Sequence, residues 1–290
     1  MSTRASNSPQ HRAFSVPVGR VIVYVLAIIF AALWFVPIWA TITTASKDAP
    51  DFFHNPFWSL PHRFNLIENM VTAWNNASLG QGFVNSLVYG VVGAAIAVLL
   101  AAIASYGLVV LKIKGSFVWF LVIFSGTLFP YQIYIVPLYQ MYSNLGLYDS
   151  QIGMLIFYVA VCIPFCTLVL RSFFSTVPDE LAQAARVDGS GEFRIFCQIY
   201  LPLSVSALLV LFLFQFTWIW NDLLFGLVLS NSPEVRPVMA SLSSLMGVYA
   251  GTSFTVVLAG ALVASLPTLL IFLGLQRYFM EGLTLVARPR

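Results

Sequence analysis

Six long apolar stretches alternate with short polar connections along the chain. Each is about as long as the 20 residues that an α-helix needs to cross the hydrocarbon core of a bilayer. They cover Val21–Thr44, Phe83–Leu111, Phe117–Tyr139, Ile152–Leu170, Leu203–Ser230 and Val256–Phe279. The pattern predicts an all-α, polytopic membrane protein with about six transmembrane helices. Residues 1–20 form an N-terminal tail, and residues 21–290 form the transmembrane domain.

The composition also indicates that lipid is the solvent of this chain. Hydrophobic residues make up 59% of it and charged residues 9%, whereas about a quarter of the residues in a soluble protein are charged. A net charge of +3 is too small to indicate nucleic acid as a partner. The three cysteines and three histidines have neither the spacing of a disulfide framework nor that of a metal site.

The first apolar stretch follows three arginines, as the core of a signal peptide does. It is longer than such a core, and no A-x-A cleavage site follows it. We therefore expect a retained helix.

The basic residues predict the orientation in the membrane. With a cytoplasmic N-terminus, 11 of the 14 Lys and Arg residues lie in cytoplasmic connections, and only Lys47, Arg63 and Arg236 lie outside. Cytoplasmic loops carry the excess of basic residues, so we expect both termini in the cytoplasm. The long outer loops are then residues 45–82 and 231–255.

One polar segment, residues 177–202, interrupts the apolar pattern between the fourth and fifth stretches. It holds six of the chain's 25 charged side chains. Thr176 and Asp179 have capping-box spacing, which indicates that Thr176 caps a helix, and Gly189 is expected to end that helix. A second short helix is expected over Glu192–Tyr200. The sequence therefore predicts a helix–glycine–helix segment on the cytoplasmic surface.

This segment also carries a recognisable motif. Its order is Gln183-Ala184-Ala185, three residues, Gly189, nine residues, and Ile199-x-Leu201-Pro202. It resembles the EAA-x3-G-x9-I-x-LP signature of importer-type ATP-binding cassette permeases. The surrounding PDELAQAARVDGSGEF and the WNDLLF at 220–225 are similar to the maltose-type carbohydrate branch of that family. The resemblance covers most of residues 83–284, and it implies a permease domain at 21–290 in the cytoplasmic (inner) membrane of a bacterium.

The resemblance implies several partners and a set of coupling residues. Two separate ATPase subunits would bind the cytoplasmic helix, beside a second homologous permease subunit and an extracytoplasmic solute-binding protein. The residues expected to couple this chain to the ATPase are Glu180, Gln183, Ala184, Ala185, Asp188 and Gly189. The usual leading Glu of the motif is Gln183 here, and Glu180, one turn earlier, is expected to replace its charge.

No nucleotide site of the P-loop type is present in the sequence. That motif requires Lys directly after Gly, and none of the three lysines follows a Gly. We therefore expect a transport subunit rather than an enzyme. It binds no cofactor itself, and ATP and Mg²⁺ belong to the partner ATPase.

Asp222 is the one formal charge that lies clearly inside an expected span, away from its ends, and an intramembrane carboxylate indicates a functional site. In a continuous helix, Gln215, Trp218 and Asp222 share one face. An amide, an aromatic ring and a carboxylate suit a sugar, so these are the expected substrate-path residues. The alternative is that Asp222 accepts hydrogen bonds from neighbouring helices and never contacts solute.

Two other functions remain open at this point. The chain could belong to an importer of another solute, such as a polyamine or glycerol phosphate. It could also be a stand-alone secondary carrier, which would need more intramembrane ionisable residues and inverted repeats.

The predicted orientation can be tested with single cysteines. A cysteine at Ser59 should react with an impermeant thiol reagent in intact cells, after permeabilisation of an outer membrane where there is one. A cysteine at Ser190 should be protected. Labelling at Ser190 under those conditions would reject the orientation.

Overall fold

The computed structural model describes residues 18–247 and 252–286, and these are helical with no β-strand among them. The long helices are α1 (Val18–Ala45), α5 (Ala94–Val109), α8 (Gln151–Phe174), α12 (Val205–Trp220) and α15 (Phe254–Val286). The shorter α-helices are α2 (Ala49–His54), α3 (Leu66–Asn76), α4 (Leu79–Val88), α6 (Ser116–Ser125), α7 (Ile135–Asn144), α9 (Asp179–Val187), α10 (Glu192–Ile195), α11 (Leu201–Leu203), α13 (Leu224–Leu229) and α14 (Val238–Ser243). Two π-helical turns, η1 (Tyr89–Gly93) and η3 (Phe196–Tyr200), and two 3₁₀ turns, η2 (Tyr131–Tyr134) and η4 (Ser244–Met246), complete the described elements.

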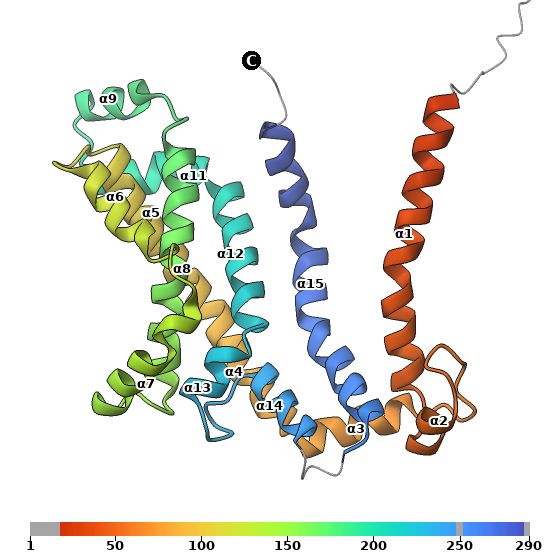
Figure 1. The fold of residues 1–290 in the computed structure, drawn as a ribbon. Coiled ribbons are helices and arrows are strands. Elements are labelled where there is room, and N and C mark those ends of the chain that lie inside the picture. Colours follow the sequence, from red (N-terminus) through yellow and green to blue (C-terminus); the bar gives the residue numbers. More distant parts are fainter. Residues whose placement is uncertain (1–17, 248–251, 287–290) are drawn as a thin grey trace, which may run out of the picture.

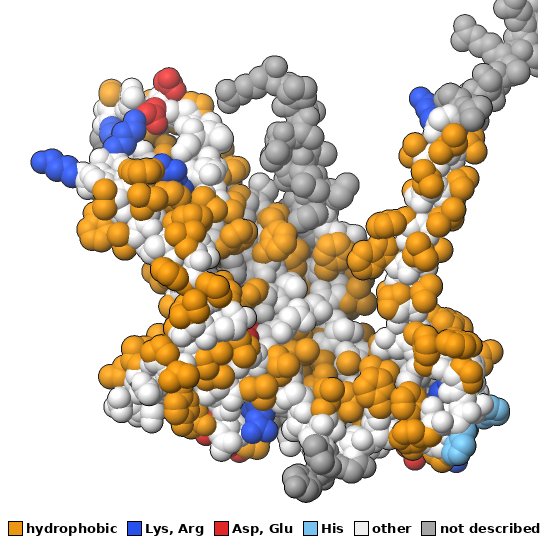
Figure 2. All heavy atoms as spheres, viewed as in Figure 1, with side chains coloured by type: hydrophobic (Ala, Val, Ile, Leu, Met, Phe, Trp, Pro, Cys, Tyr) orange, Lys and Arg blue, Asp and Glu red, His pale blue; other side chains and the backbone are white. Residues whose placement is uncertain are grey.

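The long helices form a bundle with different elements at its two ends (Figure 1). Helix α9 lies across one end, and α2, α3 and α14 lie at the other. Helix α1 stands beside the bundle and meets α15 and α3. The sides of the molecule are largely hydrophobic, and charged side chains gather towards its ends (Figure 2). This distribution is that of a protein whose sides face lipid.

Four of the predicted spans coincide with helices long and apolar enough to cross a membrane. These helices cover Gly19–Ala45, Leu79–Val109, Gln151–Phe174 and Phe254–Gly274. A fifth crossing is possible if Glu192–Leu203 and Val205–Trp220, which meet at an angle of 75°, are counted as one broken span. The described residues therefore contain four or five such helices, and the count of six stays a prediction.

The expected third span, Phe117–Tyr139, is not one continuous helix. It is divided into α6, η2 and α7, with a break at Gly126–Pro130. Pro130 has no backbone N–H to donate, and it disfavours helical geometry at the residue before it. The single helix predicted here was therefore wrong.

The expected fifth span, Leu203–Ser230, is also interrupted. Helix α12 ends at Trp220, and the short α13 begins at Leu224. The three residues between them carry Asp222, whose carboxylate accepts the N–H groups of Phe225 and Gly226 at 3.3 and 3.1 Å. A side chain that satisfies the first N–H groups of a new helix favours a restart at this point.

Small residues allow the central helices to pack closely. Helix α5 packs along α8, with Ala94, Ala97 and Ala101 fully buried. At Gly90, in η1, an added Cβ would lie only 2.7 Å from the Phe216 ring of α12. Because lipid offers no hydrophobic driving force between helices, close packing of this kind holds a bundle together.

The buried side chains form two clusters, one towards each end of the bundle. One cluster includes Tyr158, Trp220 and Phe225, and the other includes Tyr106 and Tyr200. The second cluster also contains Ala182 of α9 and Ile195 of α10, so it attaches the polar segment to the bundle.

The predicted N-terminal tail, residues 1–20, lies outside the described residues apart from its last three, which begin α1. Residues 287–290 also lie outside them. The cytoplasmic placement of both termini therefore stays a prediction.

Candidate functional site: the polar segment and the α12–α13 break

Residues 177–202, named here the coupling segment, form the helix–glycine–helix that the sequence predicts. Helix α9 is followed by Gly189 at a φ of +79°, where L-residues with a side chain are strained. The Ser190 N–H donates to the Ala185 carbonyl at 2.9 Å, and the Gly189 N–H donates to the Arg186 carbonyl at 3.0 Å. These two bonds form a Schellman motif, which satisfies the last carbonyls of the helix.

The predicted N-cap of α9 was wrong. The Thr176 hydroxyl donates to the Phe173 carbonyl at 2.7 Å, so it serves the end of α8 instead. Pro178 occupies the N-cap position, and it makes no side-chain capping bond. Asp179 and Glu180 lie in the first turn, where their negative charges complement the positive end of the helix dipole.

The Glu192 carboxylate connects three elements of the fold. The Arg186 guanidinium at the end of α9 donates to it from Nε at 2.7 Å and from Nη2 at 3.2 Å. The Tyr106 hydroxyl of α5 donates to its Oε2 at 2.7 Å. Glu192 is thus a shared acceptor for the coupling helix, the next helix and a long helix of the bundle.

These contacts also keep Glu192 charged. The hydrogen bonds from Arg186 and then Tyr106 lower the pKa of Glu192 below its ordinary value. A lowered pKa means that the carboxylate stabilises the folded segment above its unfolded pKa. That contribution is lost as the pH falls through the folded pKa. The connection is therefore intact at neutral pH.

A second ion pair connects the start of α9 to the bundle. The Lys112 ammonium, in the connection between α5 and α6, lies 2.7 Å from the Asp179 carboxylate. Both side chains are at least half exposed, so the pair contributes little energy by itself. The pair shows that the connection between α5 and α6 lies at the same end of the bundle as the coupling segment. The predicted orientation requires both to lie on one side of the membrane.

The coupling segment presents most of its predicted residues outwards. Glu180, Gln183, Ala184, Asp188 and Gly189 are exposed, and Ala185 is half-buried. Ala182 faces the opposite way and is buried against the bundle.

Two apolar side chains that sequence reasoning missed also lie exposed on the coupling segment. Val187 is 88% exposed and Phe193 is 80% exposed. Their position inside a charged segment was the sequence signal that could have identified them. Exposed apolar side chains at the polar end of a membrane protein indicate contact with a protein partner.

The coupling segment continues directly into the bundle. From Glu192 the chain stays helical through η3 and α11, and it then bends by 75° into α12. Pro202 lacks an N–H, and the Ser204 hydroxyl donates to the Tyr200 carbonyl at 2.5 Å, so the bend has a local cause. A displacement of the coupling segment would therefore act on α12.

The three predicted substrate-path residues lie at the other end of α12. Gln215 is buried, and Trp218 is half-buried. Asp222 lies beyond the end of the helix, in the break before α13. The continuous face predicted for all three residues is therefore interrupted at Trp220. They remain neighbours, since Trp218 borders a cavity with Gln215 on one side and a cavity with Asp222 on the other.

The Asp222 carboxylate has structural partners. The Tyr158 hydroxyl of α8 donates to its Oδ2 at 2.9 Å, beside the two backbone N–H groups of α13. Asp222 also lines a cavity of about 620 Å³ with Tyr131, Trp218 and Asn221. The Tyr131 and Trp218 ring centroids are 5.9 Å apart. Aromatic rings beside amide and carboxylate oxygens can stack on a sugar ring and bond its hydroxyls.

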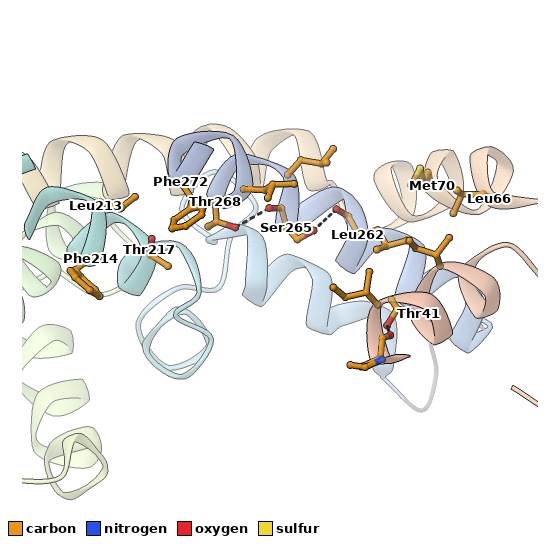
Figure 3. A pocket seen from close by; sticks show the side chains of 15 residues that line it. Thr41, Leu66, Met70, Leu213, Phe214, Thr217, Leu262, Ser265, Thr268 and Phe272 are labelled. Carbon is orange, nitrogen blue, oxygen red and sulfur yellow. Dashed lines mark hydrogen bonds between the residues drawn. The ribbon is translucent and has the colours of Figure 1, made fainter. Parts of the chain in front are cut away.

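A larger groove of about 980 Å³ lies elsewhere, between α1, α3, α12 and α15 (Figure 3). Its lining is apolar apart from Thr41, Thr217, Ser265 and Thr268. The Ser265 and Thr268 hydroxyls bond carbonyls of their own helix at 2.8 Å. Because this lining offers so few polar groups, the groove suits apolar helices or lipid better than a sugar.

No group of three His, Cys, Asp or Glu side chains able to hold a metal ion is found among the residues described. The site is thus a polar segment connected to a helix that borders a cavity.

The chain belongs to the family of binding-protein-dependent transport system inner membrane components, whose pattern matches residues 86–283. It is therefore an inner membrane component and a permease subunit of an ATP-binding cassette transporter, and it is not itself an enzyme. A transporter of this class works with an ATPase and a solute-binding protein.

Two curated relatives and one solved structure show how far the similarity extends. The melibiose/raffinose/stachyose import permease protein MelC of Bacillus subtilis is 30% identical over 264 residues, covering 91% of this chain and 94% of that protein. The sn-glycerol-3-phosphate transport system permease protein UgpE of Yersinia pestis is 28% identical, covering 90% and 94%. A chain of a bacterial ABC transporter involved in the import of the acidic polysaccharide alginate has the same fold, with a TM-score of 0.78 at 23% identity, covering 94% of this chain and 100% of that one.

Proposed function

We propose that this permease carries a sugar or an oligosaccharide into the cell by alternating access. The relative MelC is named as an import permease for three sugars. In this chain, Tyr131, Trp218, Asn221 and Asp222 line a cavity that suits a neutral, hydroxyl-rich solute. The single observation that carries the transport mechanism is the shared Glu192 carboxylate, which connects the coupling segment to the bundle.

Glycerol phosphate is the second candidate solute, because UgpE is a relative of similar coverage. A phosphate group is usually bound by Arg, Lys or backbone N–H groups. The described lining of the cavity contains one carboxylate and no Lys or Arg. This favours a neutral solute over an anionic one.

In the proposed mechanism, two ATPase subunits bind ATP and Mg²⁺ and dock on the exposed face of α9. The residues proposed for this contact are Glu180, Gln183, Ala184, Ala185, Asp188 and Gly189, of which all but the half-buried Ala185 are exposed. Val187 and Phe193 add apolar contact surface. When the ATPase subunits close on ATP, they push the coupling segment, and the bend at Ser204 transmits the push to α12. Both termini of the chain lie on this cytoplasmic side.

A second, homologous permease subunit supplies the other half of the pathway. The apolar groove between α1, α3, α12 and α15 supports this assignment, because helices of a partner would fill it. The solute-binding protein docks at the end of the bundle opposite α9.

The coupling role can be tested at Gly189. A Gly189→Ala substitution places a Cβ at a φ of +79°, which costs about 1–2 kcal/mol and distorts the end of α9. We expect binding-protein-stimulated ATPase activity and solute uptake to fall together in the assembled transporter. Gly191→Ala is the matched control, since Gly191 has a φ of −72° and open space around it. Full coupling in Gly189→Ala would count against the role.

The solute path can be tested at Trp218 and Asp222. Trp218→Ala should weaken the apparent affinity of uptake about fivefold, which corresponds to about 1 kcal/mol for a lost aromatic contact. Asp222→Asn keeps the size of the side chain and should be milder for a neutral sugar. If Asp222 only holds α8 and α13 together, its substitution will lower the yield of intact complex and leave the affinity unchanged. Unchanged affinity in both variants would remove this face from the path.

A further inference from the structure

Residues 46–65 are the first part of the outer loop 45–82, and this part, called the loop below, exposes an unusual set of large apolar side chains. Each is more than half exposed: Phe53 75%, Phe57 53%, Trp58 64%, Leu60 66% and Phe64 68%. Figure 2 shows this apolar surface around α2, next to the end of α1. Exposed aromatic residues in such number indicate that something other than water covers the loop.

The loop is held in a fixed shape. The buried Lys47 ammonium donates to the Pro56 carbonyl at 2.7 Å and to the Ser59 hydroxyl at 2.8 Å. The Asn65 N–H donates to the Ser46 carbonyl at 2.8 Å, which closes the loop. These hydrogen bonds therefore fix the loop backbone that carries the aromatic side chains.

The loop packs against the last turn of α1. The Thr44 hydroxyl, in the last turn of α1, donates to the Phe57 carbonyl at 3.4 Å. The most apolar part of α1 has no buried residue, so its shaft is open to lipid. The exposed aromatic surface thus continues a surface that crosses the bilayer.

A groove of about 440 Å³ joins the two surfaces. Trp39 and Ile42 of α1 line one side of it, and Leu60, His62 and Phe64 of the loop line the other. A groove with aliphatic and aromatic walls that opens beside a lipid-facing helix has the chemistry to hold an acyl chain.

The charges of the loop are arranged for an anionic headgroup layer. The Arg63 guanidinium is the exposed charge of the loop, whereas Lys47 and the Asp51 carboxylate are buried and the Asp48 carboxylate is half-buried. The His54 and His62 side chains are also exposed. Asp51 accepts the backbone N–H of His62 at 3.0 Å and faces its Nδ1 at 2.9 Å. In Figure 2 the histidine side chains lie along the outer edge of the loop, and apolar side chains lie between them and the shaft of α1.

We propose that the large apolar side chains of this loop enter the outer leaflet and anchor the loop to the membrane, while its polar side chains stay in water. Its aromatic side chains lie at the boundary between headgroups and acyl chains, where aromatic residues are enriched in membrane proteins. A phospholipid acyl chain occupies the groove against α1, and Arg63 faces the phosphate layer. The anchor fixes the outer end of α1, a helix that touches the bundle mainly through α15 and α3.

Spin-label accessibility tests this proposal directly. Single cysteines replace Phe53, Trp58 or Phe64 in a Cys197→Ser background, because the two remaining cysteines, Cys162 and Cys166, are buried. The full chain, with the subunits that co-purify with it, is labelled with a nitroxide and reconstituted in phospholipid nanodiscs. Glu234→Cys, an exposed position in the other outer loop, is the matched control.

At each position, power saturation compares collisions of the label with oxygen, which partitions into lipid, and with a water-soluble nickel chelate. We expect oxygen to dominate at positions 53, 58 and 64 and the nickel chelate to dominate at position 234. Dominance of the nickel chelate at any of the three loop positions would show a water-facing loop and overturn the proposal. Exclusion of both reagents there would show that a protein subunit covers the loop, and it would overturn the proposal equally.

Discussion

The attachment of α9 to the bundle depends on the Glu192 carboxylate. It accepts hydrogen bonds from Arg186 of α9 and from Tyr106 of α5, and it belongs to the helical run that leads into α12. The described contacts of α9 with the bundle also include the buried Ala182, the half-buried Ala185 and the exposed Lys112–Asp179 pair. Removal of the carboxylate would leave α9 held mainly by these two small side chains and by a screened surface pair.

The lipid solvent explains where the polar groups lie. A polar group inside the hydrocarbon core needs a protein partner, and the chain has few charges to place there. Asp222 satisfies this requirement with the Tyr158 hydroxyl and two N–H groups of α13. The same carboxylate borders a cavity next to Trp218. Its structural and solute-facing roles are therefore compatible, and only measurements on variants separate them.

The sequence was sufficient for much of this arrangement. Long apolar stretches predicted α1, α8 and α15, because lipid-length hydrophobicity is a property of composition alone. The coupling segment was predicted because Gly189 and the spaced motif are local features. The end of α12 at Trp220 was missed because this helix is apolar on all sides. Its sequence therefore has no helical periodicity whose loss would mark the end of the helix. The bond between Tyr106 and Glu192 was missed because the two residues lie 86 positions apart in the chain, and only the fold brings them together. The break at Pro130 had a local signal that the hydrophobic pattern outweighed.

The most direct test of this account is the number of solute molecules imported per ATP hydrolysed in the reconstituted transporter carrying Glu192→Gln. The amide keeps the size of the side chain but loses the charge that Arg186 binds. Glu234→Gln, on the opposite end of the molecule, is the control. The account predicts an assembled complex in which the Glu192→Gln ratio falls clearly below that of the wild type, while the control keeps it. An unchanged ratio in Glu192→Gln would contradict the claim that this carboxylate transmits the motion of the coupling segment to the bundle.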